Sequence, residues 1–443
     1  MLRPLLVLAP LVVPAAPSPD AQTVHVVRAA GFGHGVGLSQ YGAYGFAQRG
    51  RSHEAILRHY YRGAKLAKSR PRPTRVLIRQ GYSTVSVRGA GRIGDRRARP
   101  NVTYTARPGG RGVLVFRGRK RVASFPAPLR VTRRRKAVQL LGKADTGVAD
   151  GRYRGALVLH PARGGLAVVN SLNIDDYVRG VVPGEMPSTW HPEALRAQAV
   201  AARSYALASP PRSEIFDHFP DTRSQVYLGV AGERDAASAA VRATSRKVLT
   251  YRGKVITAFF FSTSGGRTEN AENSFVDSGP RPYLVSVRDP FDRISPHHRS
   301  MLRFSTRDLA RRLRGFYEGS FRSVRVTKRG VSPRIVRAEV TGTRGSRQLS
   351  GGRLRTRLDL PDTWASFTTI VSGRGSGRSR RLVGYFEPRS SRRVIVERRS
   401  GEQWKRVARG RASLTGDFSV RVRRRGLYRV RAGSLTGPAV RVR

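Results

Sequence analysis

The fold of this chain is decided by the segment from Ser171 to Leu207, SLNIDDYVRGVVPGEMPSTWHPEALRAQAVAARSYAL. A Pro-Gly pair directly before Glu185 predicts a rigid turn. Ser188 or Thr189 as the N-cap, with Pro192 in the first turn, predicts that a long helix follows. Glu185 is therefore expected between two ordered elements as a candidate acid and base, with a solvated surface charge as the alternative.

The expected helix from Pro192 to Ala208 carries Arg196 and Arg203 seven residues apart. Two residues at this spacing share one helix face, roughly 10 Å apart along the axis. An arginine fork binds a planar carboxylate through two hydrogen bonds. The pair is therefore a candidate lining for an anion-binding groove, and a solvated cationic face is the alternative.

Glycine-rich blocks supply further candidates. Ser264, Gly265 and Gly266 follow an apolar strand predicted at Val255 to Phe261, and glycine lets backbone N–H groups approach a ligand closely. A plain tight turn is the alternative for these three residues. His34 has a glycine on either side in GFGHGVG, so a permissive backbone can bring its imidazole into a cleft, although a lone histidine is often structural.

Gln225 and Tyr227 in SQVY are predicted at alternate positions of one strand, so they share a face. There they can offer an amide contact and a stacking surface to a ligand, while a core position is the alternative for Tyr227. His297 and His298 resemble a metal pair only superficially, because adjacent strand residues point to opposite faces.

Several long blocks of the chain resemble the SpoIID/LytB family of sporulation and cell-wall proteins, and together they run from about Val24 to Thr368. The glycine-rich GHGVG block precedes the SGG block, an order that resembles the versions of high-GC Gram-positive bacteria. The resemblance rests on the Ser171 to Leu207 segment and on GFGHGVGLSQYGAYGFAQRG (31–50), ILRHYYRG (56–63), SQVYLGV (224–230), AAVRATSRKVLTYRGKVITAFFFSTSGGRTEN (239–270), RGVSPRIVRAEVTG (329–342) and LRTRLDLPDTW (354–364).

The resemblance implies a lytic transglycosylase that cleaves the bond between N-acetylmuramic acid and N-acetylglucosamine in peptidoglycan strands without stem peptides. Glu185 would serve alone as acid and base, and the product would carry a 1,6-anhydro end. A hydrolase would need a second carboxylate about 5 to 9.5 Å away. Asp175 and Asp176, expected at a strand end or turn, and Glu193, expected in the first helical turn, are the nearby candidates.

The same resemblance suggests what the remaining candidates bind, with a sugar ring as the ligand of Gln225, Tyr227 and the turn at Ser264, Gly265 and Gly266. Arg196 and Arg203 match basic positions of one family motif, and the free lactyl carboxylate of peptide-free muramic acid would be their ligand. The alternative function is a non-catalytic wall-binding or amidase-enhancing protein, because the LytB name belongs to a modifier of an amidase. Peptidoglycan strands and a cell-wall amidase are thus the expected partners.

The formal net charge is +57, with 85 lysines and arginines against 28 aspartates and glutamates. The arginines are spread along the whole chain, and no helix-turn-helix, zinc-finger or RNA-binding pattern is recognisable. Anionic cell-wall polymers therefore fit better as partners than nucleic acid. The chain has no cysteine, which excludes disulfides and cysteine-based zinc sites, and neither a metal nor a cofactor is expected.

The composition predicts a mixed α+β protein in several parts. Residues 1–21 are predicted as a signal peptide, which implies an extracellular or cell-wall location. Residues 24–372 are expected to form a SpoIID-like catalytic domain with a β-rich insertion at 73–160. A Gly/Ser/Arg linker at 373–380 and an Ig-like β-sandwich at 381–443, suited to wall adhesion or spacing, complete the expectation.

Overall fold

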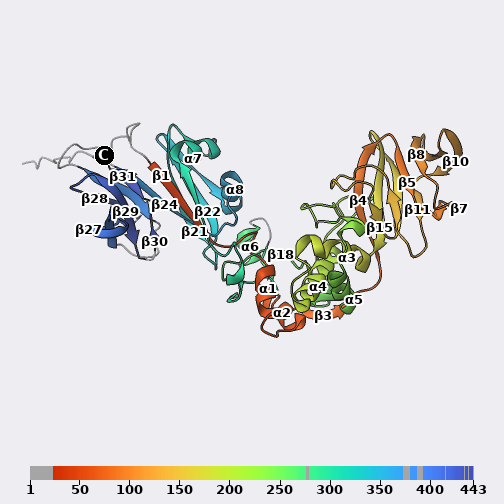
Figure 1. The fold of residues 1–443 in the computed structure, drawn as a ribbon, viewed down its shortest axis with the longest axis horizontal. Coiled ribbons are helices and arrows are strands. Elements are labelled where there is room, and N and C mark those ends of the chain that lie inside the picture. The colour runs from red at the N-terminus through yellow and green to blue at the C-terminus, as the bar shows by residue number, and fades with distance from the viewer. Residues whose placement is uncertain are drawn as a thin grey trace, which may run out of the picture. The chain divides into compact units, whose positions relative to one another are not determined.

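A computed structural model describes residues 23–275, 279–372, 380–386, 393–414, 416–433, 435–437 and 439–442. The fold is mixed α+β, as predicted (Figure 1). The chain folds into two compact units. One unit contains Gly31–His298 and Gly330–Ser332, and the other contains the described residues of Met1–Ala30, Arg299–Arg329 and Pro333–Arg443. The predicted catalytic domain at 24–372 is thus split between the two units. The predicted signal peptide lies outside the described residues.

Helix α4 (Pro192–Ala208) is the centre of the first unit and contacts α1, α2, α3, α5 and β16. Its many alanines let these neighbours approach closely, and the helix is buried over most of its length. Pro192 occupies the first turn as predicted. The predicted cap is wrong, however, because the N-cap is His191, whose Nδ1 accepts a hydrogen bond from the Glu193 N–H at 3.2 Å. The other helical segments of this unit are α1 (Gln40–Ala47), α2 (His53–Tyr60), α3 (Ile174–Glu185), α5 (Asp235–Ala243), α6 (Ala271–Ser274) and the 3-10 turns η1 (Gly229–Gly232) and η2 (Asp292–Ile294).

Arg203 lies inside the protein, which corrects the prediction that it lines an open groove. Its side chain is fully buried, and its Nε donates to Oδ1 of Asp175 at 2.7 Å. Its Nη1 donates to the carbonyls of Lys247 at 3.0 Å and Ala199 at 3.3 Å. The spacing of the arginines does not reveal that α5 and β16 cover this face of α4. Arg203 therefore fastens α4 to the first turn of α3 and to β16.

The β-rich insertion consists of two antiparallel six-stranded sheets (Figure 1). One sheet follows the order β10-β9-β8-β5-β12-β13 and the other the order β4-β15-β14-β11-β6-β7. β15 continues the second sheet beyond the predicted boundary at residue 160, and Asn173 at its end caps α3. The strands are β4 (Pro73–Tyr82), β5 (Val85–Arg88), β6 (Arg92–Ile93), β7 (Arg96–Arg97), β8 (Tyr104–Gly109), β9 (Gly112–Arg117), β10 (Lys120–Pro126), β11 (Leu129–Thr132), β12 (Val138–Leu140), β13 (Arg152–Tyr153), β14 (Ala156–Ala162) and β15 (Gly165–Asn173).

Short strands join the glycine-rich blocks of the first unit. β2 (Leu38–Ser39) pairs in parallel with β18 (Phe260–Phe261), and β16 (Lys247–Tyr251) lies between β3 (Lys65–Lys68) and β17 (Lys254–Val255). The strand predicted over Val255 to Phe261 is therefore mostly irregular, since only its two ends pair.

The second unit contains three sheets. β1 (Thr23–Ala29) lies between β19 (Ser300–Ser305) and β24 (Ala365–Ser372), and this sheet continues through β25 (Arg381–Phe386) to β28 (Asp417–Arg421). The second sheet contains β20 (Tyr317–Glu318), β21 (Phe321–Arg329), β22 (Ile335–Gly342) and β23 (Gly345–Ser350), and it lies next to helices α7 (Thr306–Arg312) and α8 (Gly351–Leu358). The third sheet contains β26 (Arg393–Ser400), β27 (Gln403–Arg411), β29 (Gly426–Ala432), β30 (Leu435–Thr436) and β31 (Val440–Val442).

The carboxyl-terminal segment packs as two β-layers, and one of these layers continues beyond the predicted boundary at residue 381. Leu382, Val396, Phe418 and Val430 belong to one apolar core shared by strands of both layers. β25 nevertheless pairs with β24, so the predicted boundary cuts through a continuous sheet. Most of the predicted linker, at 373–379, lies outside the described residues.

A buried ion pair joins two blocks of the family resemblance within this unit. Arg334 from the RGVSPR block donates from Nε and Nη2 to the two carboxylate oxygens of Asp362 in the LPDTW block, at 2.8 and 2.9 Å. Both side chains are essentially inaccessible to solvent. These blocks therefore have a structural role here.

Arg203→Ala is expected to lower the free energy of unfolding by about 3 kcal/mol or more, because it removes one member of a buried, hydrogen-bonded ion pair. Arg196→Ala on the same helix is the control and should cost about 1 kcal/mol or less, since Arg196 makes a partly solvated pair. Urea denaturation of both variants checks the difference. Equal, small losses would contradict the structural role of Arg203.

Candidate active site

Glu185 is the last residue of α3, which corrects the prediction that it lies in a separate turn. Asn173 caps the start of this helix by accepting a hydrogen bond from the Asp176 N–H at 2.8 Å. The Pro-Gly pair falls within the last helical turn, and the chain leaves the helix at Met186 in an extended conformation. Glu185 thus lies between ordered elements as predicted, but at the end of a helix and not in a turn.

Glu185 is half-buried, and its Oε1 accepts a hydrogen bond from the Val226 N–H at 3.1 Å. Burial raises the pKa of Glu185 because it disfavours the charged carboxylate, and the Val226 hydrogen bond opposes this shift. No charge from another described residue is a cause of the shift. Glu185 therefore keeps its proton to a higher pH than an ordinary glutamate, as a general acid requires.

Three separate sequence blocks meet at Glu185. Gln40, from the glycine-rich amino-terminal block, donates from Nε2 to the Glu185 carbonyl at 2.8 Å and to Oε1 of Gln198 on α4 at 3.4 Å. Val226 belongs to the SQVY block. Sequence reasoning missed Gln40, although the resemblance of the GLSQYG block was a usable signal.

Gln225 and Tyr227 support the site from inside the protein, which contradicts their predicted contact with a sugar. Both are buried, and no strand forms over SQVY. Gln225 accepts a hydrogen bond from Tyr177 at 3.2 Å and donates to the Ala202 carbonyl at 3.4 Å. Tyr227 donates to Oδ1 of Asn170 at 2.7 Å and is a core residue. The predicted alternative for Tyr227 is thus the correct one.

An aromatic cluster joins the start of α1 to the loop after Glu185. The ring of Trp190 stacks on Tyr44 at 4.6 Å between centroids, with an angle of 10° between the planes. Tyr41 meets the same indole edge-on at 4.7 Å. All three side chains are half-exposed, so they offer aromatic surface to a ligand. Tyr41 follows Gln40 directly, and Trp190 comes five residues after Glu185.

His34 is partly exposed among aromatic residues. Its Nδ1 accepts a hydrogen bond from the Val36 N–H at 3.1 Å, and its ring lies within 5.7 Å of the rings of Phe259, Phe261 and Phe275. Both flanking glycines have positive φ, +125° at Gly33 and +83° at Gly35, so the backbone does need glycine there. A contact between His34 and substrate stays a prediction.

The SGG turn binds a protein carboxylate instead of presenting its N–H groups to a sugar. Oδ2 of buried Asp292 accepts hydrogen bonds from Oγ of Ser264 at 3.0 Å, the Gly265 N–H at 2.6 Å and the Gly266 N–H at 3.1 Å. The expectation of sugar-binding N–H groups at Ser264, Gly265 and Gly266 is therefore contradicted. The predicted alternative, a tight turn, fits the structure better, and this turn also binds the buried carboxylate of Asp292.

The three candidate second carboxylates have other partners. Asp175 and Asp176 lie in the first turn of α3, so the helix rise places their backbone about 14 to 15 Å from that of Glu185. Glu193, in the first turn of α4 as predicted, accepts a hydrogen bond from Nδ1 of His53 at 2.7 Å and pairs with Arg196. Arg196 is therefore neutralised, although it stays partly exposed.

In the described ranges, no three histidine, cysteine, aspartate or glutamate side chains gather closely enough to hold a metal ion. His297 and His298 lie in a turn instead of a strand. Nδ1 of His298 lies 3.1 Å from Asp292, and the His297 ring packs on Phe32.

Over the same ranges, no helix is long and apolar enough to cross a membrane.

Comparison with known proteins identifies relatives of this chain. The family model described as SpoIID, stage II sporulation protein, matches residues 162–251, which include Glu185. Stage II sporulation protein D of Bacillus amyloliquefaciens is 31% identical over 244 residues, covering 49% of this chain and 69% of that protein. The protein of the same name from Bacillus subtilis is 32% identical over 212 residues, covering 43% and 59%.

An amidase enhancer of Bacillus subtilis is 42% identical over 116 residues, covering 26% of this chain and 15% of that protein. The chain thus spans less than two thirds of the Bacillus subtilis relatives' lengths. The resemblance to high-GC Gram-positive versions stays a prediction. Because the chain covers more than two thirds of the Bacillus amyloliquefaciens relative at 31% identity, it belongs to the SpoIID family.

Proposed function

We propose that this protein is a lytic transglycosylase that cleaves peptidoglycan glycan strands with Glu185 as its single acid and base. The observation that carries the proposal is a half-buried glutamate with a raised pKa, far along α3 from Asp175 and Asp176. A hydrolase would need a second carboxylate within about 5 to 9.5 Å. A transglycosylase needs only one, because the substrate supplies the nucleophile.

The reaction balances without water. Protonated Glu185 donates its proton to the glycosidic oxygen between N-acetylmuramic acid and N-acetylglucosamine, and the bond from that oxygen to the anomeric carbon breaks. The C6 hydroxyl of the muramic acid then bonds to the anomeric carbon and gives its proton to the Glu185 carboxylate. The products are a strand with a 1,6-anhydro end and a strand with a free 4-hydroxyl, and Glu185 is protonated again.

The aromatic cluster of Tyr41, Tyr44 and Trp190 supports a carbohydrate substrate. Sugar rings have apolar faces that pack on aromatic side chains, and these rings lie in the segments that flank Gln40 and Glu185. Arg196 is partly exposed, but it would have to exchange its Glu193 partner to bind the lactyl carboxylate of a peptide-free strand. Arg203 is not a candidate for this contact, because it is buried in its pair with Asp175.

The alternative function is enhancement of a cell-wall amidase without cleavage, which the similarity to the amidase enhancer favours. In that case Glu185 would be a structural residue and glycan binding would occur without product. Export to the cell wall belongs to both proposals, and the amino-terminal segment at 1–21 is its expected signal.

Glu185→Gln is expected to lower turnover of peptide-free glycan by about 100-fold or more while glycan binding persists, because the amide keeps the shape but has no transferable proton. Release of soluble fragments from purified strands measures turnover, and co-sedimentation with strands measures binding. Glu214→Gln, at an exposed glutamate of the same unit, is the control and should leave both unchanged. If the Glu185→Gln variant kept more than about a tenth of the parent's turnover, Glu185 would not be the acid.

The raised pKa of Glu185 also predicts how stability depends on pH. Protonated Glu185 contributes stability below its unfolded-state pKa of about 4.3, and this contribution is lost as pH rises through the higher folded-state pKa. Glu185→Gln should therefore unfold with a higher free energy than the parent at pH 7. Urea denaturation of both proteins from pH 4 to pH 7 tests this. A constant difference between them over that range would show that burial does not raise the pKa.

Trp190→Ala is expected to weaken binding of peptide-free glycan by about 2- to 10-fold, since one aromatic contact is worth about 0.5 to 1.5 kcal/mol. The effect should fall on KM more than on kcat, and Trp190→Phe should restore most of it. Trp404→Ala, on β27, is the control. If the Trp404 variant lost as much binding as the Trp190 variant, the aromatic cluster would not be the glycan platform.

A further inference from the structure

A polar row crosses three neighbouring strands of the insertion. Gln139 on β12 is the register partner of Arg88 on β5 and of Arg152 on β13. Directly paired residues of antiparallel strands point to the same face of a sheet. Their strand neighbours Val87 and Tyr153 are buried, so the row of Arg88, Gln139 and Arg152 faces outward.

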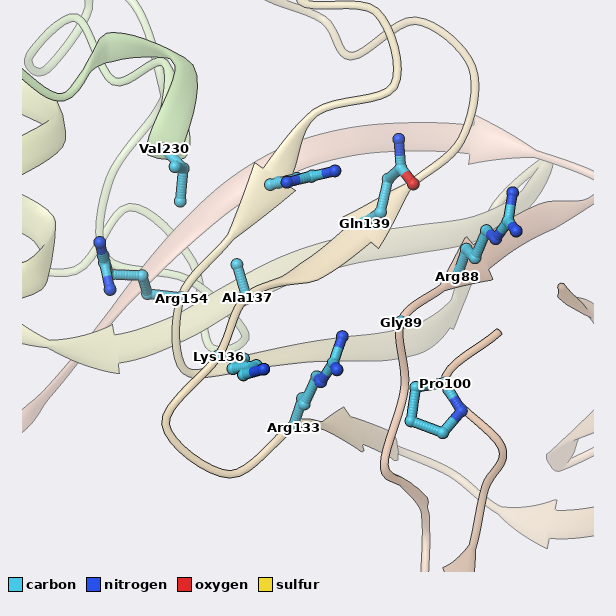
Figure 2. Close-up of a pocket in the computed structure, with 10 residues that line it drawn as sticks. Arg88, Gly89, Pro100, Arg133, Lys136, Ala137, Gln139, Arg154 and Val230 are labelled. Atoms are coloured by element: carbon cyan, nitrogen blue, oxygen red, sulfur yellow. The ribbon is translucent and has the colours of Figure 1, made fainter. Parts of the chain in front are cut away.

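A loop and a turn close this row into a cavity of about 460 Å³ (Figure 2). Arg133 and Lys136 lie on the connection from β11 to β12 and line the cavity, and Figure 2 shows them next to each other below Gln139. Arg154, which follows β13, lies on the opposite side next to Val230 of η1. Five cationic side chains therefore surround one hollow.

Four of these cations are uncompensated. Arg154 donates to both carboxylate oxygens of Glu233, at 2.6 and 2.8 Å, so its charge is neutralised. Within the described part of the chain, Arg88, Arg133, Lys136 and Arg152 form no ion pair, and no carboxylate lines the cavity. Unpaired arginines are common in a chain of net charge +57, but here four cations converge on a concave surface, which focuses an attractive field on an anion.

The lining also indicates which anion fits. Arginine forks match the oxygens of a phosphate group, and the cavity has the size of a site for a short ligand segment. None of the residues that line it is aromatic, so it offers no stacking surface for nucleic-acid bases. We propose that the insertion binds a phosphodiester polymer without bases, such as a polyol phosphate chain, at this cavity.

This second site is separate from the residues around Glu185, and it does not depend on the proposed reaction. It would hold the protein on a phosphate-bearing polymer while Glu185 acts on a different one. The shared chemistry of the ligand is the backbone phosphodiester, and the experiment distinguishes its possible sources.

The test uses the full chain and a short, labelled poly(glycerol phosphate), with binding followed by fluorescence anisotropy. At an ionic strength of about 0.15 M, exposed charges are screened beyond about 8 Å, which suppresses diffuse attraction. The triple variant Arg88→Gln, Arg133→Gln and Arg152→Gln should bind about tenfold more weakly or worse, because it removes charge-assisted hydrogen bonds. The single variants Arg88→Gln and Arg152→Gln should each show part of this loss, which keeps the test decisive if the triple variant folds poorly.

The matched control is Arg117→Gln, Arg119→Gln and Arg121→Gln, three exposed residues around the β9–β10 hairpin of the same sheet. This control removes the same charge and should change affinity less than about twofold, since exposed charges contribute little at this ionic strength. Equal losses in both triple variants, or no loss in the cavity variant, would overturn the proposal.

Two competing polymers test the ligand class. A single-stranded oligonucleotide and polyglutamate, matched in charge, should bind to the parent more weakly than poly(glycerol phosphate). Tighter, cavity-dependent binding of the oligonucleotide would overturn the exclusion of nucleic acid, and equal binding of polyglutamate would overturn the selectivity for phosphate.

Discussion

The buried pair of Arg203 and Asp175 is the interaction on which the candidate active site depends. Asp175 lies in the first turn of α3, and Glu185 lies at the other end of the same helix. Arg203 belongs to the central helix α4, so its pair with Asp175 sets the position of α3 relative to α4. The same guanidinium also donates to the Lys247 carbonyl of β16. A residue predicted to bind substrate thus acts at a distance, by fixing the helix that carries the proposed acid.

Many of the sequence blocks that resemble the family contact other segments of the chain in the structure. Gln40 reaches the Glu185 carbonyl, and Val226 reaches its carboxyl group. Asp292 closes the SGG turn, and Arg334 pairs with Asp362 in the other unit. These contacts position the half-buried Glu185 between ordered elements, and a lone acid and base there would suit a reaction whose nucleophile belongs to the substrate. The same unit also contains the basic cavity of the insertion, which is the proposed site for a phosphodiester polymer.

Local pattern predicted the elements better than it predicted the surroundings of their side chains. A first-turn proline correctly indicated α4, although the predicted cap was wrong, and alternating segments indicated the strands of the insertion. The helical seat of Glu185, the burial of Arg203 and Tyr227, and the sheet shared by β24 and β25 depend on contacts between distant segments. Helix spacing shows which residues share a face, but it does not show what packs against that face.

Cleavage of the bond without water can be measured by digesting purified peptide-free glycan in ¹⁸O-labelled water and analysing the fragments by mass spectrometry. We expect 1,6-anhydro ends that contain no label, since the C6 hydroxyl of the substrate is the nucleophile and Glu185 returns to its protonated state. Reducing ends that carry ¹⁸O would contradict this mechanism, because they would mean that an activated water, and therefore a second catalytic group, takes part.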